Sequence, residues 1–400
     1  MNPSRFIHVL SLDTIGGVEA LYTHYITHAL SVSNHSHYTC VSGKLPHKQI
    51  AKQFARSKHT PFLEEYVLKM RFPRLLRSFV QFRRTLLETR VAPSAWVFWN
   101  RIEAKRPPGM SIYYEHGAAW NEQPTKAKES FLKSHQCICA NSQAAGTILK
   151  KKWGISLPIT VIPNPLRPDI SIKSHARSAP HSQPIILGFI GRLVPVKGVG
   201  VALHTLKILR DRNIDVRLKI VGTGPDKISL QRQASCLNIE SAIEWIDHLS
   251  DVSSFYDTID LLLLPSVREP LGLVSLEAAA RGVPVIATAI DGIPEAVLDK
   301  KTGICVHPTL HLFEAKEMMT SLHLMPSSVV NPMTQELIAP KVVDPTLYAD
   351  AICASLHTPG LYETMSINAL EHAQSRAEFG RYYQQIQALL GETVISSGNQ

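Results

Sequence analysis

The sequence predicts an α/β protein built from two domains, each with a parallel sheet. With 400 residues, the chain is longer than a single hydrophobic core usually supports, so two domains are expected. Residues 261–287 read as a buried strand, a loop, a helix and a second buried strand, which together form a βαβ unit. Residues 6–29 read as a strand, a glycine turn and a helix, so a similar unit opens the chain.

The functional prediction depends on residues 261–297. Leu261–Leu264 form an apolar run that suits a strand buried on both faces of a parallel sheet. A loop with Glu269 follows, and Gly272 opens a helix that Gly282 closes. Ligands of open α/β sheets bind at such loops, because the free N–H groups and the dipole of the following helix favour negative charge there.

Seven residues separate Glu269 from Glu277 across this loop and the start of the helix. Backbone amides between them could hold a phosphate, whereas the carboxylates accept hydrogen bonds from donors such as sugar hydroxyls. The arrangement suits a sugar nucleotide, with one Glu for the sugar and the other for the ribose. A solvated helix face is the alternative explanation of a Glu pair at this spacing.

The segment 269–277, EPLGLVSLE, resembles the E-x7-E motif of retaining glycosyltransferases of family 4, and other segments match that family in order and spacing. The resemblance, to members of bacterial surface-glycan type, implies the GT-B fold, in which two Rossmann-like parallel-sheet domains face each other across a cleft. It places an N-terminal acceptor-side domain at residues 1–165 and a nucleotide-sugar donor domain at residues 185–375. Residues 166–184 are polar, with repeated Pro, Ser and His, and are the expected linker. A C-terminal helix within residues 376–400 is expected to cross back to the first domain.

Two cations follow the strand that opens the second domain. Arg192 comes directly after this strand and Lys197 lies five residues further on, before a helix expected to begin near Val199. A guanidinium can grip phosphate oxygens bidentately and an ammonium adds a point charge, so the pair suits a diphosphate. The pattern G-R-x-x-x-x-K-G is also close to that of family 4. Solvated surface charge is the alternative.

The resemblance extends to three further places. Gly16 and Gly17 resemble the G-G-x-E loop that approaches the donor diphosphate in family 4, although a plain structural turn would also explain them. His116 follows a strand predicted at residues 111–115 and resembles the family's H-G position, whose histidine lines the cleft beside the transferred sugar. It is expected to bind a sugar hydroxyl rather than to act as a general base. Gly222 lies in a loop that in the family approaches the nucleotide base, or is simply a turn glycine.

The implied activity is transfer of a hexosyl or N-acetylhexosaminyl group from a nucleoside diphosphate to an acceptor hydroxyl, with retention of the anomeric configuration. The expected catalytic residues are Glu269, His116, Arg192 and Lys197. The expected donor-binding residues are Gly16, Gly17, Arg192, Lys197, Gly222, Leu271, Gly272, Leu273, Val274, Ser275 and Glu277. The two cations and backbone amides would stabilise the departing diphosphate, so no metal and no other cofactor is expected. The alternatives are a GT-B fold sugar-nucleotide epimerase and a non-catalytic nucleotide-sugar-binding protein.

The formal net charge of +9 is unevenly distributed. Residues 44–106 contain 15 Lys or Arg and four Glu but no Asp, a local net charge of +11. Residues 74–90 predict an amphipathic helix with Arg77, Arg84 and Arg90 outside its apolar side. Docking on an anionic membrane surface is one interpretation, and a domain helix with a solvated arginine face is the other. A glycolipid or lipopolysaccharide-core type acceptor would fit such a surface, and nucleic acid is not an expected partner.

Compartment is predicted from what the sequence lacks. It contains no run of 18 apolar residues and no recognisable cleavable signal, and its six cysteines are scattered. The protein is therefore expected in the cytoplasm, where it could associate peripherally with the cytoplasmic face of the inner membrane.

Overall fold

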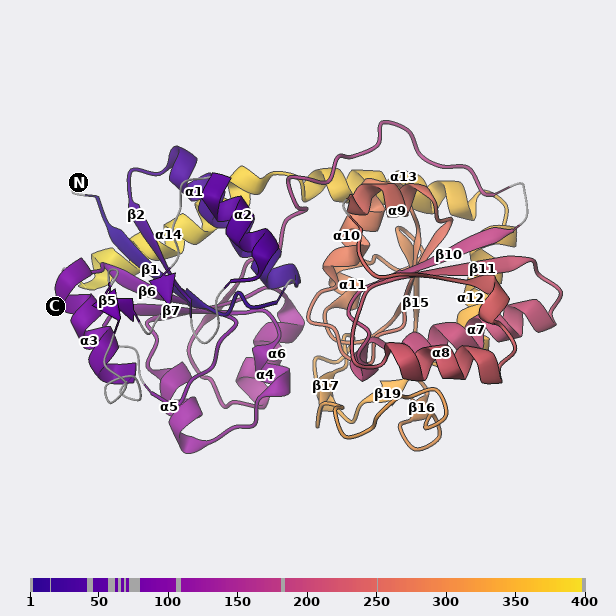
Figure 1. The fold of residues 1–400 in the computed structure, drawn as a ribbon, viewed down its shortest axis with the longest axis horizontal. Helices are drawn as coiled ribbons and strands as arrows, with labels where there is room; N and C mark the ends of the chain where they lie inside the picture. Colours follow the sequence, from indigo (N-terminus) through magenta and orange to yellow (C-terminus); the bar gives the residue numbers. More distant parts are fainter. Residues whose placement is uncertain are drawn as a thin grey trace. The chain divides into compact units, whose positions relative to one another are not determined.

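The structure is a computed structural model that describes residues 3–14, 16–41, 46–56, 62–63, 66–67, 70–71, 80–105, 109–180, 184–249 and 251–397. The chain divides into two compact units (Figure 1). Unit 1 consists of Met1–Asn164 and Phe379–Gln400, and unit 2 consists of Pro165–Glu378. No helix in the described part of the chain is both long enough and apolar enough to cross a membrane.

Unit 1 is built on a seven-stranded parallel sheet with the strand order β3-β2-β1-β6-β7-β8-β9. The strands are β1 (Arg5–Leu10), β2 (Ser36–Val41), β3 (Phe62–Leu63), β6 (Ala95–Trp99), β7 (Ser111–Glu115), β8 (Cys137–Ala140) and β9 (Ile159–Val161). A separate antiparallel pair is formed by β4 (Tyr66–Val67) and β5 (Met70–Arg71). The order of the large sheet reverses between β1 and β6, so the loops after these two strands flank a switch point.

Helices cover both faces of the unit 1 sheet. They are α1 (Gly17–Val32), α2 (Lys48–Arg56), α3 (Val80–Val91), α4 (Ala118–Asn121), α5 (Lys126–Lys133), α6 (Gln143–Lys151) and α14 (Phe379–Ser397). Strand β6 reads AWVFW and is buried throughout, as expected for a strand covered on both sides. Val97 and Trp99 pack in one core with α1 and with Tyr382 of α14, whereas Phe98 contacts Phe131 of α5. The C-terminal helix is therefore part of the unit 1 core.

Unit 2 is built on a six-stranded parallel sheet with the order β12-β11-β10-β13-β14-β15. The strands are β10 (Ile185–Ile190), β11 (Val216–Val221), β12 (Ile243–Ile246), β13 (Leu261–Leu264), β14 (Val285–Thr288) and β15 (Gly303–Val306). Numbered within the unit, this is the order 3-2-1-4-5-6 of nucleotide-binding Rossmann folds. The order reverses between β10 and β13, which places the switch point there.

The helices of unit 2 follow its strands along the chain. They are α7 (Val199–Asp211), α8 (Lys227–Cys236), α9 (Val252–Asp257), α10 (Leu273–Ala280), α11 (Ile293–Ala296), α12 (Pro345–His357) and α13 (Leu361–Ser375), with the 3-10 turns η2 (Pro195–Lys197) and η3 (Glu240–Ala242). Residues 310–343, whose structure the sequence pattern does not predict, contain two short antiparallel pairs. These pairs are β16 (Leu310–His311) with β19 (Lys341–Val342), and β17 (Val329–Val330) with β18 (Leu337–Ile338).

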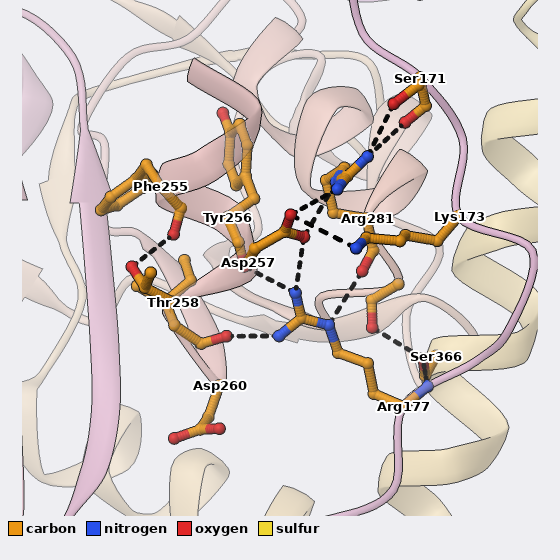
Figure 2. A network of polar contacts seen from close by, with 12 residues as sticks. Ser171, Lys173, Arg177, Phe255, Tyr256, Asp257, Thr258, Asp260, Arg281 and Ser366 are labelled. Atoms are coloured by element: carbon orange, nitrogen blue, oxygen red, sulfur yellow. Dashed lines mark hydrogen bonds and ion pairs between the residues drawn. The ribbon is translucent and has the colours of Figure 1, made fainter. Parts of the chain in front are cut away.

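The first part of the predicted linker packs on unit 2. Arg177 donates three hydrogen bonds to backbone carbonyls, to Ile259 and Tyr256 at 2.7 Å each and to Arg281 at 2.9 Å (Figure 2). The Arg281 guanidinium in turn pairs with the Asp257 carboxylate, at 3.0 and 2.5 Å. Carbonyls at helix ends have no partner within the helix, so the Arg177 side chain satisfies groups that α9 and α10 leave open. The chain around Arg177 is thereby fixed to unit 2.

The prediction of a solvated arginine face on residues 74–90 is wrong at Arg84. In α3, the Arg84 side chain is fully buried and donates from Nη1 and Nη2 to the two carboxylate oxygens of Glu103, at 2.6 and 2.9 Å. A buried guanidinium needs such a partner, because an unpaired charge in the interior is costly. Arg90 is exposed, whereas Arg77 lies outside the described residues.

Candidate functional site

The predicted donor-binding residues of unit 2 follow strands that are neighbours in the sheet. Arg192 and Lys197 follow β10, Gly222 follows β11, and Glu269 follows β13. All three loops leave the carboxyl ends of parallel strands, and β10 and β13 flank the point where the strand order reverses. Loops at such a switch point form the ligand-binding crevice of open α/β sheets. The topology therefore brings both cations and Glu269 to one edge of the sheet.

Backbone contacts hold the loops after β10 and β11 together. The Leu193 amide donates to the Thr223 carbonyl at 2.9 Å. Gly222 has φ 142°, and a Cβ at this position would lie 1.9 Å from the carbonyl oxygen of Gly191. Only glycine fits here, so Gly222 has a structural role in addition to any contact with a ligand.

Lys197 and Glu269 contact each other directly. The Lys197 ammonium donates a hydrogen bond to Oε2 of Glu269, in an ion pair that joins the loops after β10 and β13. The two side chains are 22% and 11% exposed, so both remain accessible to a small polar ligand. Arg192 is exposed. The edge of the sheet thus presents Arg192, Lys197 and Glu269.

The backbone after Glu269 is shaped for the entry into α10. Gly272 has φ 86° and ψ 61°, a left-handed conformation that favours glycine. Leu273 and Val274 begin the helix, where the first N–H groups have no acceptor within the helix. The amide and hydroxyl of Ser275 both donate to the Gly272 carbonyl, at 2.9 and 2.7 Å, so they already have an acceptor. Leu271 is buried and packs in the core beneath the helix.

Glu277 is buried on α10 and already has two partners. Arg167 donates from Nη1 to Oε1 at 3.2 Å, and the Tyr256 hydroxyl donates to Oε2 at 2.8 Å. Burial raises the pKa of the Glu277 carboxyl, and the neighbouring Arg167 and Tyr256 act in the opposite direction. A carboxylate has lone pairs for further hydrogen bonds, so a hydroxyl could still bind. The sequence analysis missed Arg167 and Tyr256, and its only signal for them was a buried acid that requires partners.

The remaining predicted site residues belong to unit 1. Gly16 ends the connection that follows β1, and Gly17 is the first residue of α1. Gly16 is extended, with φ −142° and ψ −178°, a conformation that any residue adopts. The structure therefore places Gly16 directly before a helix and gives no backbone requirement for glycine at Gly16.

The turn after β7 is held by two side chains that the sequence analysis missed. Asn100, at the end of β6, accepts hydrogen bonds on Oδ1 from the amides of His116 and Ala118, at 3.1 and 2.8 Å. The fully buried Glu115 carboxylate accepts from the amides of Gly117 and Ala119, the latter at 3.1 Å. These contacts fix the backbone around His116. A carboxylate directly before the H-G pair was the only signal in the sequence.

The His116 ring is buried between aromatic rings. Its centre lies 4.1 Å from that of Tyr114 and 5.8 Å from that of Trp99. Burial lowers the pKa of His116 to about 3, so the ring is neutral at physiological pH. Neither ring nitrogen has a hydrogen-bond partner among the described residues. Buried polar atoms are normally paired, so these nitrogens are candidates for contact with a ligand.

The predicted site residues thus form two groups. Arg192, Lys197, Gly222, Glu269, Leu271, Gly272, Leu273, Val274, Ser275 and Glu277 lie in unit 2, and Gly16, Gly17 and His116 lie in unit 1. Within the described ranges, no group of three or more His, Cys, Asp or Glu side chains is arranged to hold a metal ion.

Residues 171–323 match the family model described as glycosyl transferases group 1. The D-inositol 3-phosphate glycosyltransferase of Corynebacterium glutamicum is 34% identical over 129 residues, which cover 30% of this chain and 31% of that protein. A GDP-mannose-dependent alpha-(1-6)-phosphatidylinositol monomannoside mannosyltransferase of Mycolicibacterium smegmatis is 35% identical over 151 residues, which cover 36% of this chain and 39% of that protein. The chain therefore spans between about a third and two fifths of the length of these curated relatives.

Solved structures match nearly the whole chain. A glycosyltransferase from Rickettsia africae superposes with a TM-score of 0.72 at 15% identity, over 98% of this chain and 99% of that chain. Anabaena HepE in complex with UDP and glucose superposes with a TM-score of 0.71 at 16% identity, over 97% and 100%. WaaG, a glycosyltransferase involved in lipopolysaccharide biosynthesis, superposes with a TM-score of 0.63 at 15% identity, over 96% and 99%. The chain thus has the predicted GT-B fold, and its residues 171–323, which carry Arg192, Lys197, Glu269 and Glu277, match the group 1 glycosyltransferases.

Proposed function

We propose that this protein is a retaining glycosyltransferase of family 4 that moves a sugar from a nucleoside-diphosphate donor to an acceptor hydroxyl. The observation that carries the proposal is the ion pair of Lys197 with Glu269, with Arg192 on the same loop, at the switch point of unit 2. A site with adjacent positive and negative groups suits a ligand with a charged diphosphate and a polyhydroxyl end. The match of residues 171–323 to a glycosyltransferase family supports the same reading.

In the proposed reaction, the bond between the anomeric carbon and the diphosphate oxygen breaks, and the acceptor oxygen bonds to the same face of that carbon. The acceptor proton passes to the departing phosphate. Arg192, Lys197 and the amides of Leu273 and Val274 stabilise the charge on the diphosphate, which is the usual role of preorganised donors at a leaving group. Two fixed cations supply this positive charge, so the proposal includes no metal ion. Glu277 binds the ribose.

In the proposed reaction, Glu269 and His116 bind hydroxyls of the transferred sugar. Glu269 accepts hydrogen bonds from sugar hydroxyls once the diphosphate competes for Lys197. His116 contacts a hydroxyl through its unpaired ring nitrogens, and because its ring is neutral it can donate from one nitrogen and accept on the other. Gly16 and Gly17 allow the backbone to approach the diphosphate.

The first prediction concerns the Lys197–Glu269 pair. A panel of sugar nucleotides is incubated with and without glycolipid acceptors, and released nucleoside diphosphate and glycosylated product are measured. We expect Lys197→Ala and Glu269→Ala each to lower kcat/KM by at least about 100-fold, as for loss of other charge-stabilising groups. Nuclear magnetic resonance of the product should show the anomeric configuration of the donor.

Matched controls in unit 2 are Lys207→Ala and Glu244→Ala, whose charged groups form exposed ion pairs with Asp211 and Lys219 away from the strand ends. They should keep wild-type rates. Parental rates in both site variants would disprove the site assignment. Donor turnover without any acceptor product would instead indicate an epimerase or hydrolase, and donor binding without turnover would indicate a non-catalytic binding protein.

For the acceptor, we propose a glycolipid of cell-envelope glycan synthesis, such as a lipopolysaccharide core, reached at the cytoplasmic face of the inner membrane. The net charge of +11 in residues 44–106 supports attraction to an anionic surface. The buried Arg84 does not contribute to this surface. Sedimentation with vesicles of phosphatidylglycerol and phosphatidylcholine should show binding at 20 mM salt that is lost at 500 mM salt. Absence of binding at low salt would remove the physical support for this acceptor.

A further inference from the structure

Asp291 links residues 310–343 to the loop that carries Glu269, although these residues lie more than 40 positions after Glu269 in the sequence. The contact runs through Asp291, which lies between β14 and α11 and is 1% exposed. One carboxylate oxygen of Asp291 accepts from the amide of Glu269 at 3.0 Å, and the other accepts from the amide of Val330 at 2.7 Å. A single buried side chain therefore joins the candidate sugar-binding loop to β17.

Backbone hydrogen bonds reinforce both sides of this bridge. The Asp291 amide donates to the Val330 carbonyl at 3.0 Å, so β17 is held by a reciprocal pair of bonds. The Gly292 amide donates to the Glu269 carbonyl at 3.2 Å. Both peptide groups of Glu269 are thus fixed by the turn that contains Asp291. The Glu269 carboxylate has its position set by this turn and by Lys197.

Asp291 has a backbone conformation that is uncommon for a residue other than glycine. Its φ is 47°, in the left-handed region where residues with a Cβ are uncommon. Glycine would adopt this conformation at lower cost. The hydrogen bonds that two amides donate to the Asp291 carboxylate offset this conformational cost. Hydrogen bonds to a buried carboxylate are charge-assisted and therefore stabilise the groups that they join.

Residues 310–343 also contact elements that follow β10 and β11. Thr320 donates to the Asp226 carboxylate, in the loop after β11, and the Met318 carbonyl lies against Gly200 at the start of α7. Residues 310–343 therefore contact elements that follow β10, β11 and β14. The segment is a brace that spans the strand ends of unit 2.

We propose that Asp291 is a positioning residue that holds Glu269 in place by anchoring it to the brace formed by residues 310–343. This inference rests on the proposed function, because the role of Glu269 defines what Asp291 positions. Asp291 acts through Glu269 and contacts neither donor nor acceptor. Its removal should therefore affect the step in which Glu269 is needed more than the binding of the diphosphate.

The test uses Asp291→Gly and Asp291→Asn in the full chain. Glycine tolerates the backbone conformation but removes both anchoring bonds, so the variant can fold without the bridge. Asparagine also tolerates this conformation and keeps one acceptor oxygen. Its NH2 group cannot accept a hydrogen bond, so one of the two backbone amides loses its acceptor. Asn213→Gly is the control, since Asn213 has φ 59° in an exposed turn between α7 and β11.

We expect Asp291→Gly to lower kcat by about 10- to 100-fold, the scale of an ångström-sized misplacement, while the donor KM changes by less than about threefold. Asp291→Asn should retain an intermediate kcat, and Asn213→Gly should match the wild type. Wild-type kcat in Asp291→Gly, or a loss that appears only in the donor KM, would overturn the inference.

Amide hydrogen exchange keeps this test separate from the proposed function. Exchange of the Glu269 and Val330 amides should be faster in Asp291→Gly than in the wild type and unchanged in Asn213→Gly. Unchanged exchange at both amides would show that Asp291 does not anchor this loop. If the wild type transfers no sugar from any donor while exchange responds as expected, the proposed function fails and the anchoring role of Asp291 stands.

Discussion

The buried carboxylate of Glu277 can bind a hydroxyl strongly only while it carries its charge. Burial raises its pKa, and the nearby Arg167 guanidinium opposes that rise. Arg167 also pairs with Asp169, whose negative charge acts on Glu277 in the same direction as burial. The protonation of Glu277 is thus set by residues that a ligand need not contact.

This balance gives a prediction for the pH dependence of donor binding. In Arg167→Ala, the pKa of Glu277 should rise, so the carboxylate protonates at a higher pH and the donor KM begins to increase at a higher pH than in the wild type. Asp169→Asn removes a negative charge near Glu277, so the donor KM should begin to increase at a lower pH than in the wild type. The measurement is the donor KM between pH 5 and 8. Shifts in the same direction for both variants would contradict this account.

At the level of single residues, the sequence allowed predictions for side chains that follow a buried strand. Lys197 and Glu269 were predicted because each follows an apolar run that can only be a buried strand, and parallel strand ends share one edge. Arg167 and Asp291 could not be predicted, since their partners lie 110 and 22 positions away. No local pattern encodes such distances.

Among the elements, strands buried on both faces were predicted best. Ser111–Glu115 and Leu261–Leu264 have the bounds expected from the sequence, and every residue of both strands is buried, as in a sheet covered on both faces. Helix α3 shows the opposite case. An arginine on the polar side of an amphipathic pattern reads as solvated, and its burial depends on Glu103, which lies beyond the helix.

The Arg84–Glu103 pair predicts a large effect on unit 1. Arg84→Ala removes one of the two cations that pair with the Glu103 carboxylate among the described residues, and that carboxylate is 10% exposed. The substitution should lower the free energy of unfolding by about 3 to 5 kcal/mol. Arg90→Ala on the same helix, where the side chain is exposed, should change it by less than about 0.5 kcal/mol. Urea denaturation followed by tryptophan fluorescence measures this, because four of the five tryptophans lie in unit 1. Equal effects of the two substitutions would refute the prediction.

The stability of the whole molecule should depend on pH through its buried histidines. His135 packs against Phe131 with the ring centres 4.6 Å apart, and burial lowers its pKa to about 3, as for His116. In the unfolded chain, a histidine titrates near pH 6.5. The unfolded state therefore takes up protons first, and stability that is complete above about pH 6.5 is lost as the pH falls towards 3.

Between pH 7 and pH 5, each such histidine should lower the free energy of unfolding by about 2 kcal/mol. His135→Leu keeps a side chain of similar volume without a titrating group, so it should reduce this pH dependence by about 2 kcal/mol. Urea titrations at both pH values, followed by tryptophan fluorescence, give the comparison. An unchanged pH dependence in the variant would show that His135 does not contribute.

The place of α14 in unit 1 affects how the chain is made. Phe379, Tyr382, Tyr383, Ile386 and Leu390 of α14 complete a core whose remaining members come from the first 162 residues. More than 200 residues of unit 2 are therefore synthesised in between. At a ribosome's rate of about 5 to 20 residues per second, the nascent first unit waits about 10 to 40 s for its last helix. During that interval its apolar surface is open to chaperones, and the second unit, although synthesised later, can finish folding first.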